Sequence, residues 1–215
     1  MFEYADRHLS GEDVLVGLLG SAFAPPPDVP SFLQARLLFP YGAGQTFAER
    51  LYNAAGDWTL VDIAYRRRPP ASTEQVLHPD AYLRFEEPRR VRLDRPLGDG
   101  WRVVDTDTLG EWQTAEVLRG AGGGGAGAAA AGWGGDRYRV YQPGEGPALV
   151  WYVVWDDPRS AERFLRSAAG LRSTARRGYR ATPDTLTLDG RAVTRYVLAP
   201  AAWARWKALP EITLP

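Results

Sequence analysis

Apolar residues recur every three to four positions through much of the first hundred residues, a spacing that predicts amphipathic helices. The first helix is expected over residues 6–23, before a run of three prolines. A second is expected to begin at Pro30 and to end at Pro40, because proline lacks the backbone N–H that a helix interior needs. Gly42 and Gly44 follow and predict a turn.

Two more helices are expected before residue 70. One covers residues 45–55 and ends at Gly56, a residue type that favours helix C-termini. Asp57 is a candidate N-cap for the next helix, which is predicted to bury Trp58, Val61, Ala64 and Tyr65. Three arginines, at 66–68, lie at the C-terminal end of this helix, where the helix dipole favours positive charge. They therefore indicate a solvated helix terminus rather than a basic binding patch.

Ser72 and Gln75 have the spacing of a capping box and predict a short helix. His78 precedes Pro79, which disfavours helical backbone at His78 and predicts the helix end there. In a functional role, Glu74 and His78 would face a cleft, and His78 would hydrogen-bond a bound carbonyl. In a structural role, Glu74 would support the first helical turn and His78 would bond backbone carbonyls at the helix end. Folding alone explains these residues, which favours the structural role.

Short apolar or alternating runs predict strands after residue 100. A strand is expected to begin at Trp101 and a helix to cover residues 107–119. After a glycine-rich loop, residues 126–131 are candidates for a helix of small side chains.

Two hairpins complete the predicted pattern, one over residues 136–155 and one over residues 186–198, the second closed by an Asp-Gly turn. A helix from Asp157 to Gly170 separates them. Trp151 and Trp155 lie four apart on one strand face, which favours core packing over an aromatic binding groove. The predicted fold class is α+β, with a mainly helical part over residues 1–100 and an α+β part with antiparallel hairpins over residues 101–215. Whether these parts pack as one domain is left open.

Length and charge restrict the classes of partner. The chain has 215 residues, enough for one large domain or two small ones. Its 26 basic and 26 acidic residues give no net charge, which argues against nucleic acid as a partner. No apolar run is long enough to span a membrane, and the start lacks the features of a signal peptide. A cytoplasmic protein is expected from the chain as given; the alternative is an exported protein whose true N-terminus lies upstream.

The residue types limit the possible chemistry. Cysteine is absent, which excludes thiol chemistry, and only His8 and His78 could serve as imidazole ligands or bases. The glycine-rich tract at 120–132 lacks the Lys-Ser/Thr of a phosphate-binding loop, and no Gly-x-Ser-x-Gly is present. His8 near three acidic residues is the one clustered metal option, and a lone surface histidine is the more frequent explanation. We therefore expect no metal and no cofactor.

Several sequence strings are specific in order and spacing. They are Leu-Phe-Pro-Tyr at 38–41, Gly-Asp-Trp at 56–58, Ser-Thr-Glu-Gln-Val-Leu-His-Pro at 72–79, Leu-Gly-Glu-Trp at 109–112 and Gly-Trp-Gly-Gly-Asp-Arg-Tyr at 132–138. Together they resemble the bacterial zinc-metallopeptidase-like proteins, whose members are often exported or lipid-anchored. The resemblance spans roughly residues 6–164 and implies that the helical part is similar to the C-terminal lobe of a zincin.

The resemblance implies that the metal centre is lost. Members that look active carry a His-Glu-x-x-His helix and, on the next helix, a glutamate ligand. This chain contains no His-Glu-x-x-His, and Ser10 stands in place of the glutamate. A hydroxyl cannot match a carboxylate as a zinc ligand, and no glutamate remains to activate the water. The expected function is that of a non-catalytic, metallopeptidase-like protein that binds a peptide or a partner protein. The alternative is a zinc-dependent peptidase whose metal-binding helix is missing from this chain, and Ser10 favours the first.

Overall fold

The structure, a computed structural model, describes residues 29–93, 102–122, 124–142, 144, 146–173, 175–204, 206 and 209–215. Two compact units are distinguished, residues 1–42 and residues 43–215. The helix expected over residues 6–23 lies outside the described residues, as do His8, Ser10 and Trp101. None of the described helices is long and apolar enough to cross a membrane.

The first described helix is α3 (Ser31–Ala55), which continues through Pro40, so the predicted helix end at this proline is wrong. Gly42 and Gly44 lie inside the helix and have no positive φ, so they form no turn. Proline removes one backbone hydrogen bond, and a helix of 25 residues retains bonds on both sides of it. The predicted stop at Gly56 is confirmed, because this residue follows α3 with a φ of +76°.

Three short helices follow α3: α4 (Thr59–Arg66), α5 (Thr73–Leu77) and α6 (Pro79–Leu83). With α3 they form a buried core of Phe47, Leu51, Ala64 and Tyr82, and Val61 packs against it. Trp58 and Tyr65 are 53% and 85% exposed, so their predicted inward orientation is wrong. In so short a helix, Val61 and Ala64 alone provide the contact with the core. Trp58 instead packs against Tyr52, with ring centroids 4.9 Å apart.

The environment of Arg68 differs from the solvated helix end that was expected. Its guanidinium group lies 4.1 Å from the ring centroid of Tyr82 and 3.8 Å from that of Phe85. Such cation–π contacts stabilise a charged side chain against an aromatic surface. Arg66 and Arg67 are exposed, as predicted.

A five-stranded sheet forms the centre of the second half of the chain. Its strands are β2 (Arg102–Asp107), β3 (Trp133–Gln142), β4 (Ala148–Trp155), β5 (Tyr179–Leu188) and β6 (Arg191–Pro200). Their order is β2-β3-β4-β6-β5, with every neighbouring pair antiparallel. Both predicted hairpins are confirmed, and the turn of the second has positive φ at Asp189 and Gly190. The α+β fold class is thereby confirmed.

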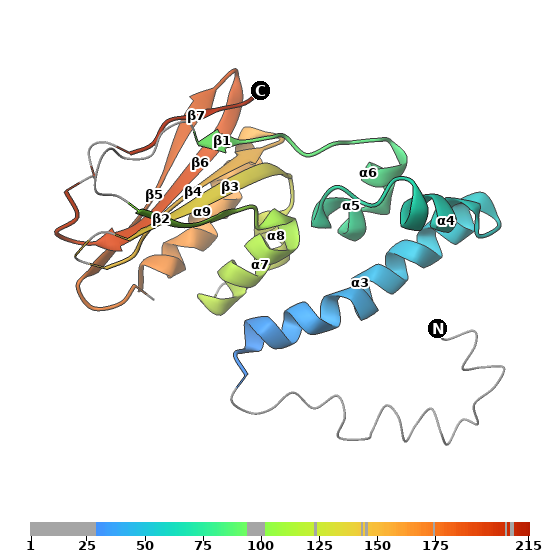
Figure 1. The fold of residues 1–215 in the computed structure, drawn as a ribbon, viewed down its shortest axis with the longest axis horizontal. Helices are drawn as coiled ribbons and strands as arrows, with labels where there is room; N and C mark the ends of the chain where they lie inside the picture. Colours follow the sequence, from blue (N-terminus) through green and yellow to red (C-terminus); the bar gives the residue numbers. More distant parts are fainter. Residues whose placement is uncertain are drawn as a thin grey trace. The chain divides into compact units, whose positions relative to one another are not determined.

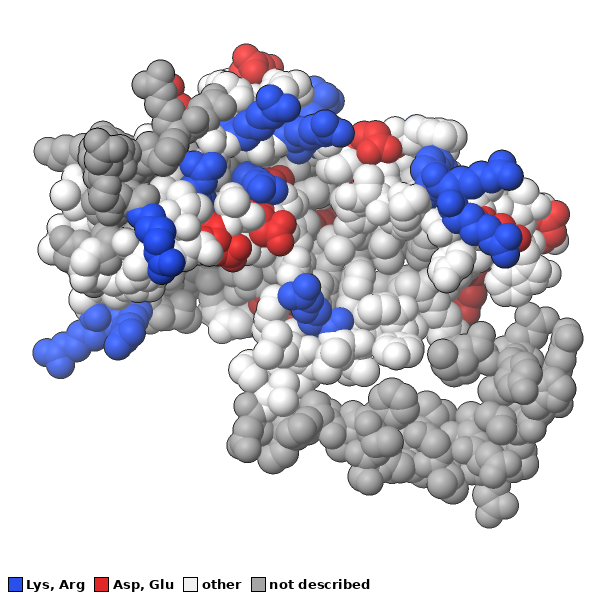
Figure 2. Space-filling model, viewed as in Figure 1, with Lys and Arg blue, Asp and Glu red and all other residues white. Residues whose placement is uncertain are grey.

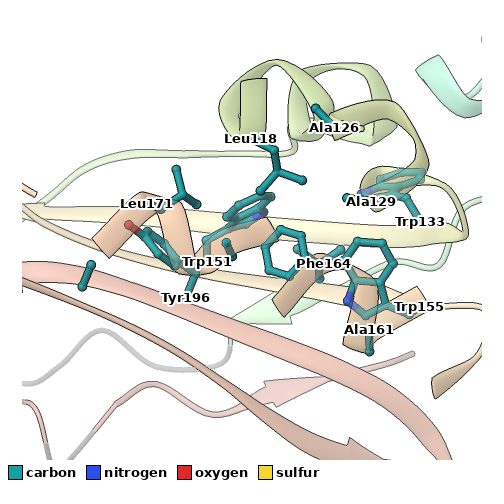
Figure 3. Packing of buried hydrophobic residues seen from close by; sticks show 13 residues of the cluster. Leu118, Ala126, Ala129, Trp133, Trp151, Trp155, Ala161, Phe164, Leu171 and Tyr196 are labelled. Carbon is teal, nitrogen blue, oxygen red and sulfur yellow. The ribbon is translucent and has the colours of Figure 1, made fainter. Parts of the chain in front are cut away.

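Three helices cover one face of this sheet: α7 (Gly110–Gly120), α8 (Ala126–Ala130) and α9 (Pro158–Ser173) (Figure 1). Trp151 and Trp155 of β4 point to this face, and both contact Phe164 of α9 (Figure 3). Their predicted role in core packing is confirmed. The predicted end of α9 at Gly170 is wrong, because Gly170 fits closely against Ala121 O within the continuing helix.

The opposite face of the sheet is covered by a small two-stranded sheet of β1 (Arg92–Leu93) and β7 (Ile212–Thr213). Val91, Leu93 and Ile212 are buried there against residues of β4 and β6. The extended segment 87–93 thus crosses from the short helices onto the sheet.

Candidate functional site

A groove of about 1180 Å³ lies where the short helices, segment 87–93 and the sheet meet. One wall is residues 70–73 with Val76, a second wall is segment 87–93, and the rest comes from the ends of β2, α7 and β3. In Figure 1 the segment before β1 runs from α6 to the sheet, and α5 lies beside α7. The lining mixes apolar, hydroxyl and arginine side chains, which is suited to binding rather than to a dry core.

Asp136 is among the residues that line the groove and is 3% exposed. Its carboxylate accepts hydrogen bonds from the backbone N–H groups of Leu109 and Gly110, each at 2.9 Å. The indole N–H groups of Trp133 and Trp151 donate to it at 3.0 and 2.9 Å. Burial raises the pKa of Asp136, and the four N–H donors act in the opposite direction by stabilising the carboxylate.

This arrangement gives Asp136 a structural role. Both carboxylate oxygens are occupied, and the donors come from the start of α7 and from two strands of the sheet. The side chain therefore fixes α7 on the sheet and is not placed to hold a ligand.

Helix α5 contacts the start of α7 closely. The Trp112 N–H donates to Thr73 Oγ1 at 3.2 Å. Gly110 has a φ of +77°, and a Cβ there would lie only 2.5 Å from Thr73 Oγ1. A glycine is required at this position both by the backbone conformation and by the close approach of α5.

His78 Nε2 lies 2.9 Å from Glu111 Oε1, and this contact joins the end of α5 to α7. The Glu111 side chain is 4% exposed, whereas that of His78 is 52% exposed. Oε2 of Glu111 has no hydrogen-bond partner among the described residues. Burial raises the pKa of Glu111, and the hydrogen bond from His78 opposes this change.

Glu74 is buried on α5, near the same group of acidic residues. Burial, followed by the negative charges of Asp156 and Glu111, raises the pKa of Glu74 to about 8. A carboxyl group in this setting carries a proton at neutral pH.

The predicted N-cap is confirmed, because Ser72 Oγ accepts a hydrogen bond from the Gln75 N–H at 3.3 Å. The ring of His78 bonds Glu111 in place of the backbone carbonyls expected in its structural role. Neither Glu74 nor His78 is among the residues that line the groove. A functional role of these two residues stays a prediction.

Sequence reasoning missed Glu111 and Asp136 as site residues, although each lies in a string that carries the resemblance. It also missed the arginines at 89, 90 and 92, where basic and apolar residues alternate. Over the described part of the chain, no three His, Asp or Glu side chains are grouped so that they could hold a metal ion. The expectation that the protein binds no zinc stays a prediction.

Comparison with known proteins identifies one family. Residues 81–202 match the family model described as "Domain of unknown function (DUF8575)". The matched region contains segment 87–93, α7 and the five strands, but not the wall formed by residues 70–73 and Val76. No curated protein and no solved structure matches the chain.

Proposed function

The chain belongs to the DUF8575 family, a domain of unknown function whose model matches more than half of its length, and we propose that it is a non-catalytic protein that binds a peptide or a partner protein. The binding site is the groove between residues 70–73 with Val76, segment 87–93 and the start of α7. The observation that carries this proposal is the groove itself, a large open site beside a rigidly fixed helix start.

The size of the groove favours an extended ligand. Its volume of about 1180 Å³ exceeds the roughly 300–1,000 Å³ typical of pockets for small molecules. The lining contains apolar side chains such as Val76 and Leu109 as well as hydroxyl and arginine side chains. A peptide presents the same mixture along its length, so its side chains can pair with both kinds of surface.

Catalysis has less support in the geometry. His78, oriented by Glu111, is the best candidate for a general base, because a buried carboxylate often positions a catalytic imidazole. However, His78 does not line the groove, and Asp136, which does, has both oxygens occupied by N–H donors. The resemblance to metallopeptidases is compatible with a binding role, since the chain contains no His-Glu-x-x-His.

Selection from a peptide display library, followed by affinity measurement, tests this proposal. Ala71 is exposed and lines the groove, so Ala71→Trp should obstruct it without disturbing a buried contact. We expect Ala71→Trp to weaken binding of the selected peptides at least about tenfold, the equivalent of about 1.4 kcal/mol. Ala54→Trp, an exposed position on α3 outside the groove lining, is the matched control and should bind as the unmodified protein does.

Equal affinities of the two tryptophan variants would contradict the proposal, provided that both melt at the temperature of the unmodified protein. The same conclusion would follow if the library yielded no specific binder.

A further inference from the structure

We propose that the groove selects an extended acidic segment, a peptide whose aspartate and glutamate side chains pair with Arg90, Arg92 and Arg137. This inference rests on the proposed function and adds to it the chemical class of the ligand. Its basis is a set of arginines whose backbone is fixed and whose charges are not balanced by ion pairs with described acidic residues.

The alternation along segment 87–93 determines where these arginines point. Val91 and Leu93 are 7% and 8% exposed and belong to the core beneath the sheet. Arg90 and Arg92 are exposed and line the groove. Since neighbouring residues of an extended chain point to opposite sides, burial of Val91 and Leu93 directs both arginines away from the core.

Contacts with β3 fix the backbone of this segment. The Arg89 N–H donates to Gly134 O at 2.6 Å, and Arg139 Nη2 donates to Leu93 O at 3.0 Å. A Cβ at Gly135 would overlap Arg89 O, so only glycine permits the approach. The arginines are therefore presented from a backbone that is already ordered, which lowers the entropic cost of binding.

Arg137 belongs to the same surface. It precedes Arg139 by two positions on β3, and the period of two places both on one face of the strand. Arg139 reaches Leu93 O of segment 87–93, so this face is the one that the segment crosses. Both residues line the groove.

Basic residues outnumber acidic residues in the groove lining, although the whole chain has no net charge. It contains five arginines, at positions 89, 90, 92, 137 and 139, and two acidic residues, Glu87 and Asp136. The Asp136 carboxylate is occupied by four N–H donors, as described above. Figure 2 shows basic side chains gathered where β1 and the segment before it cross the sheet.

The ion pairs between described residues leave Arg90, Arg92 and Arg137 without an acidic partner. Arg89 is less available, because its charge already acts on Asp156 and opposes the raised pKa of that carboxyl. A guanidinium group pairs with a carboxylate through two parallel hydrogen bonds, so unpaired arginines at a groove favour carboxylate ligands.

The distribution of these arginines favours a peptide over a compact anion. Arg90 and Arg92 follow an extended segment and Arg137 comes from a separate strand, so they line the groove rather than surround one point. Exposed Asp105 and Asp107 on β2 add negative charge beside the groove. They repel a nucleic acid, which is charged at every unit, more than a peptide whose acidic residues are separated by apolar ones. A peptide that mixes acidic and apolar residues suits both the arginines and the apolar lining.

Fluorescence anisotropy with labelled peptides tests the inference on the full chain. The probe is a peptide of about ten residues that alternates Glu and Leu and spans about 33 Å when extended. Peptides of equal length that alternate Gln or Lys with Leu are the comparison. We expect the Glu peptide to bind most tightly, with an affinity that falls as salt is raised.

Charge reversal locates the interaction. The double variant Arg90→Glu, Arg137→Glu should weaken binding of the Glu peptide at least about tenfold and strengthen binding of the Lys peptide. The double variant Arg176→Glu, Arg177→Glu makes the same change in net charge at two exposed positions outside the groove lining and should leave the ranking unchanged.

Equal weakening in both double variants, or a Glu peptide that binds no better than the Gln peptide, would overturn the inference. So would a single-stranded RNA oligonucleotide that displaces the Glu peptide, since the arginines would then serve a nucleic acid. If the Gln peptide binds equally well and Ala71→Trp blocks it, the acidic preference fails and the proposed function survives. If no peptide of any charge binds, both fail.

Discussion

Burial raises the pKa of both Asp136 and Glu74, but the two carboxyl groups differ in their hydrogen-bond donors. Asp136 has four N–H donors, so its ionised form is matched by the surrounding structure. For Glu74, burial is the main cause of the raised pKa, and the nearby negative charges of Asp156 and Glu111 favour the protonated form further. The first residue fixes the start of α7, and the second makes the fold sensitive to pH.

Glu74 predicts a loss of stability as pH rises. Its pKa of about 8 in the folded protein exceeds the ordinary value of 4.5, so the folded protein holds a proton that the unfolded chain releases. This contribution is complete below about pH 4.5 and is lost as pH rises through about 8. We expect the free energy of unfolding, measured by urea denaturation, to decrease across that range.

Glu74→Gln keeps the shape of the side chain and removes its charge. The variant should show a shallower decrease and should be more stable than the unmodified protein above pH 8 by about 2–4 kcal/mol. Glu162→Gln, at an exposed position of α9, should leave the pH profile unchanged. An identical slope in the Glu74 variant and the unmodified protein would show that Glu74 does not carry this dependence.

At the level of elements, the docking of α5 on α7 connects the short helices with the sheet. Thr73 bonds the Trp112 N–H near the start of α5, and His78 bonds Glu111 at its end. Because Glu111 is 4% exposed, its carboxylate has few other ways to be solvated. The His78–Glu111 contact therefore contributes to the docking of α5 on α7.

His78→Ala should lower the free energy of unfolding by about 1 kcal/mol, the usual cost of a lost hydrogen bond. Peptide affinity should be unchanged, because His78 does not line the groove. A double-mutant cycle with Glu111→Gln checks the cause, since removal of His78 should cost less when the carboxylate is already gone. Reduced peptide affinity in a fully stable His78→Ala would instead favour the functional role.

The elements were predictable where local chemistry decides them. The Ser72 cap, the Asp189-Gly190 turn and the strands that flank it follow from short-range rules, and the structure confirms them. The helix end expected at Pro40 failed because the rest of a long helix tolerates one missing bond. The exposed rings of Trp58 and Tyr65 were missed because periodicity identifies a face but not how much of it the neighbours cover.

At the level of the whole molecule, the groove could not be predicted, because its walls are far apart in sequence. Residues 70–73 with Val76, and residues from 87–93, 106–113 and 133–139, meet only after the sheet has formed. The alternation of arginine and apolar residues at 89–93 indicates a local basic surface, but the net charge of zero for the whole chain does not reveal it. Glu74 and His78, chosen from one local motif, lie outside the groove lining for the same reason.

The measurement that tests the central claim most directly is amide hydrogen exchange of the full chain with and without a selected peptide. A ligand bound in the groove should slow amide exchange in residues 70–76, 87–93 and 106–113. Exchange in α9, on the face of the sheet that the helices cover, should be unchanged. Slower exchange confined to α3 and α4, with none in segment 87–93, would place the binding site elsewhere and contradict the account.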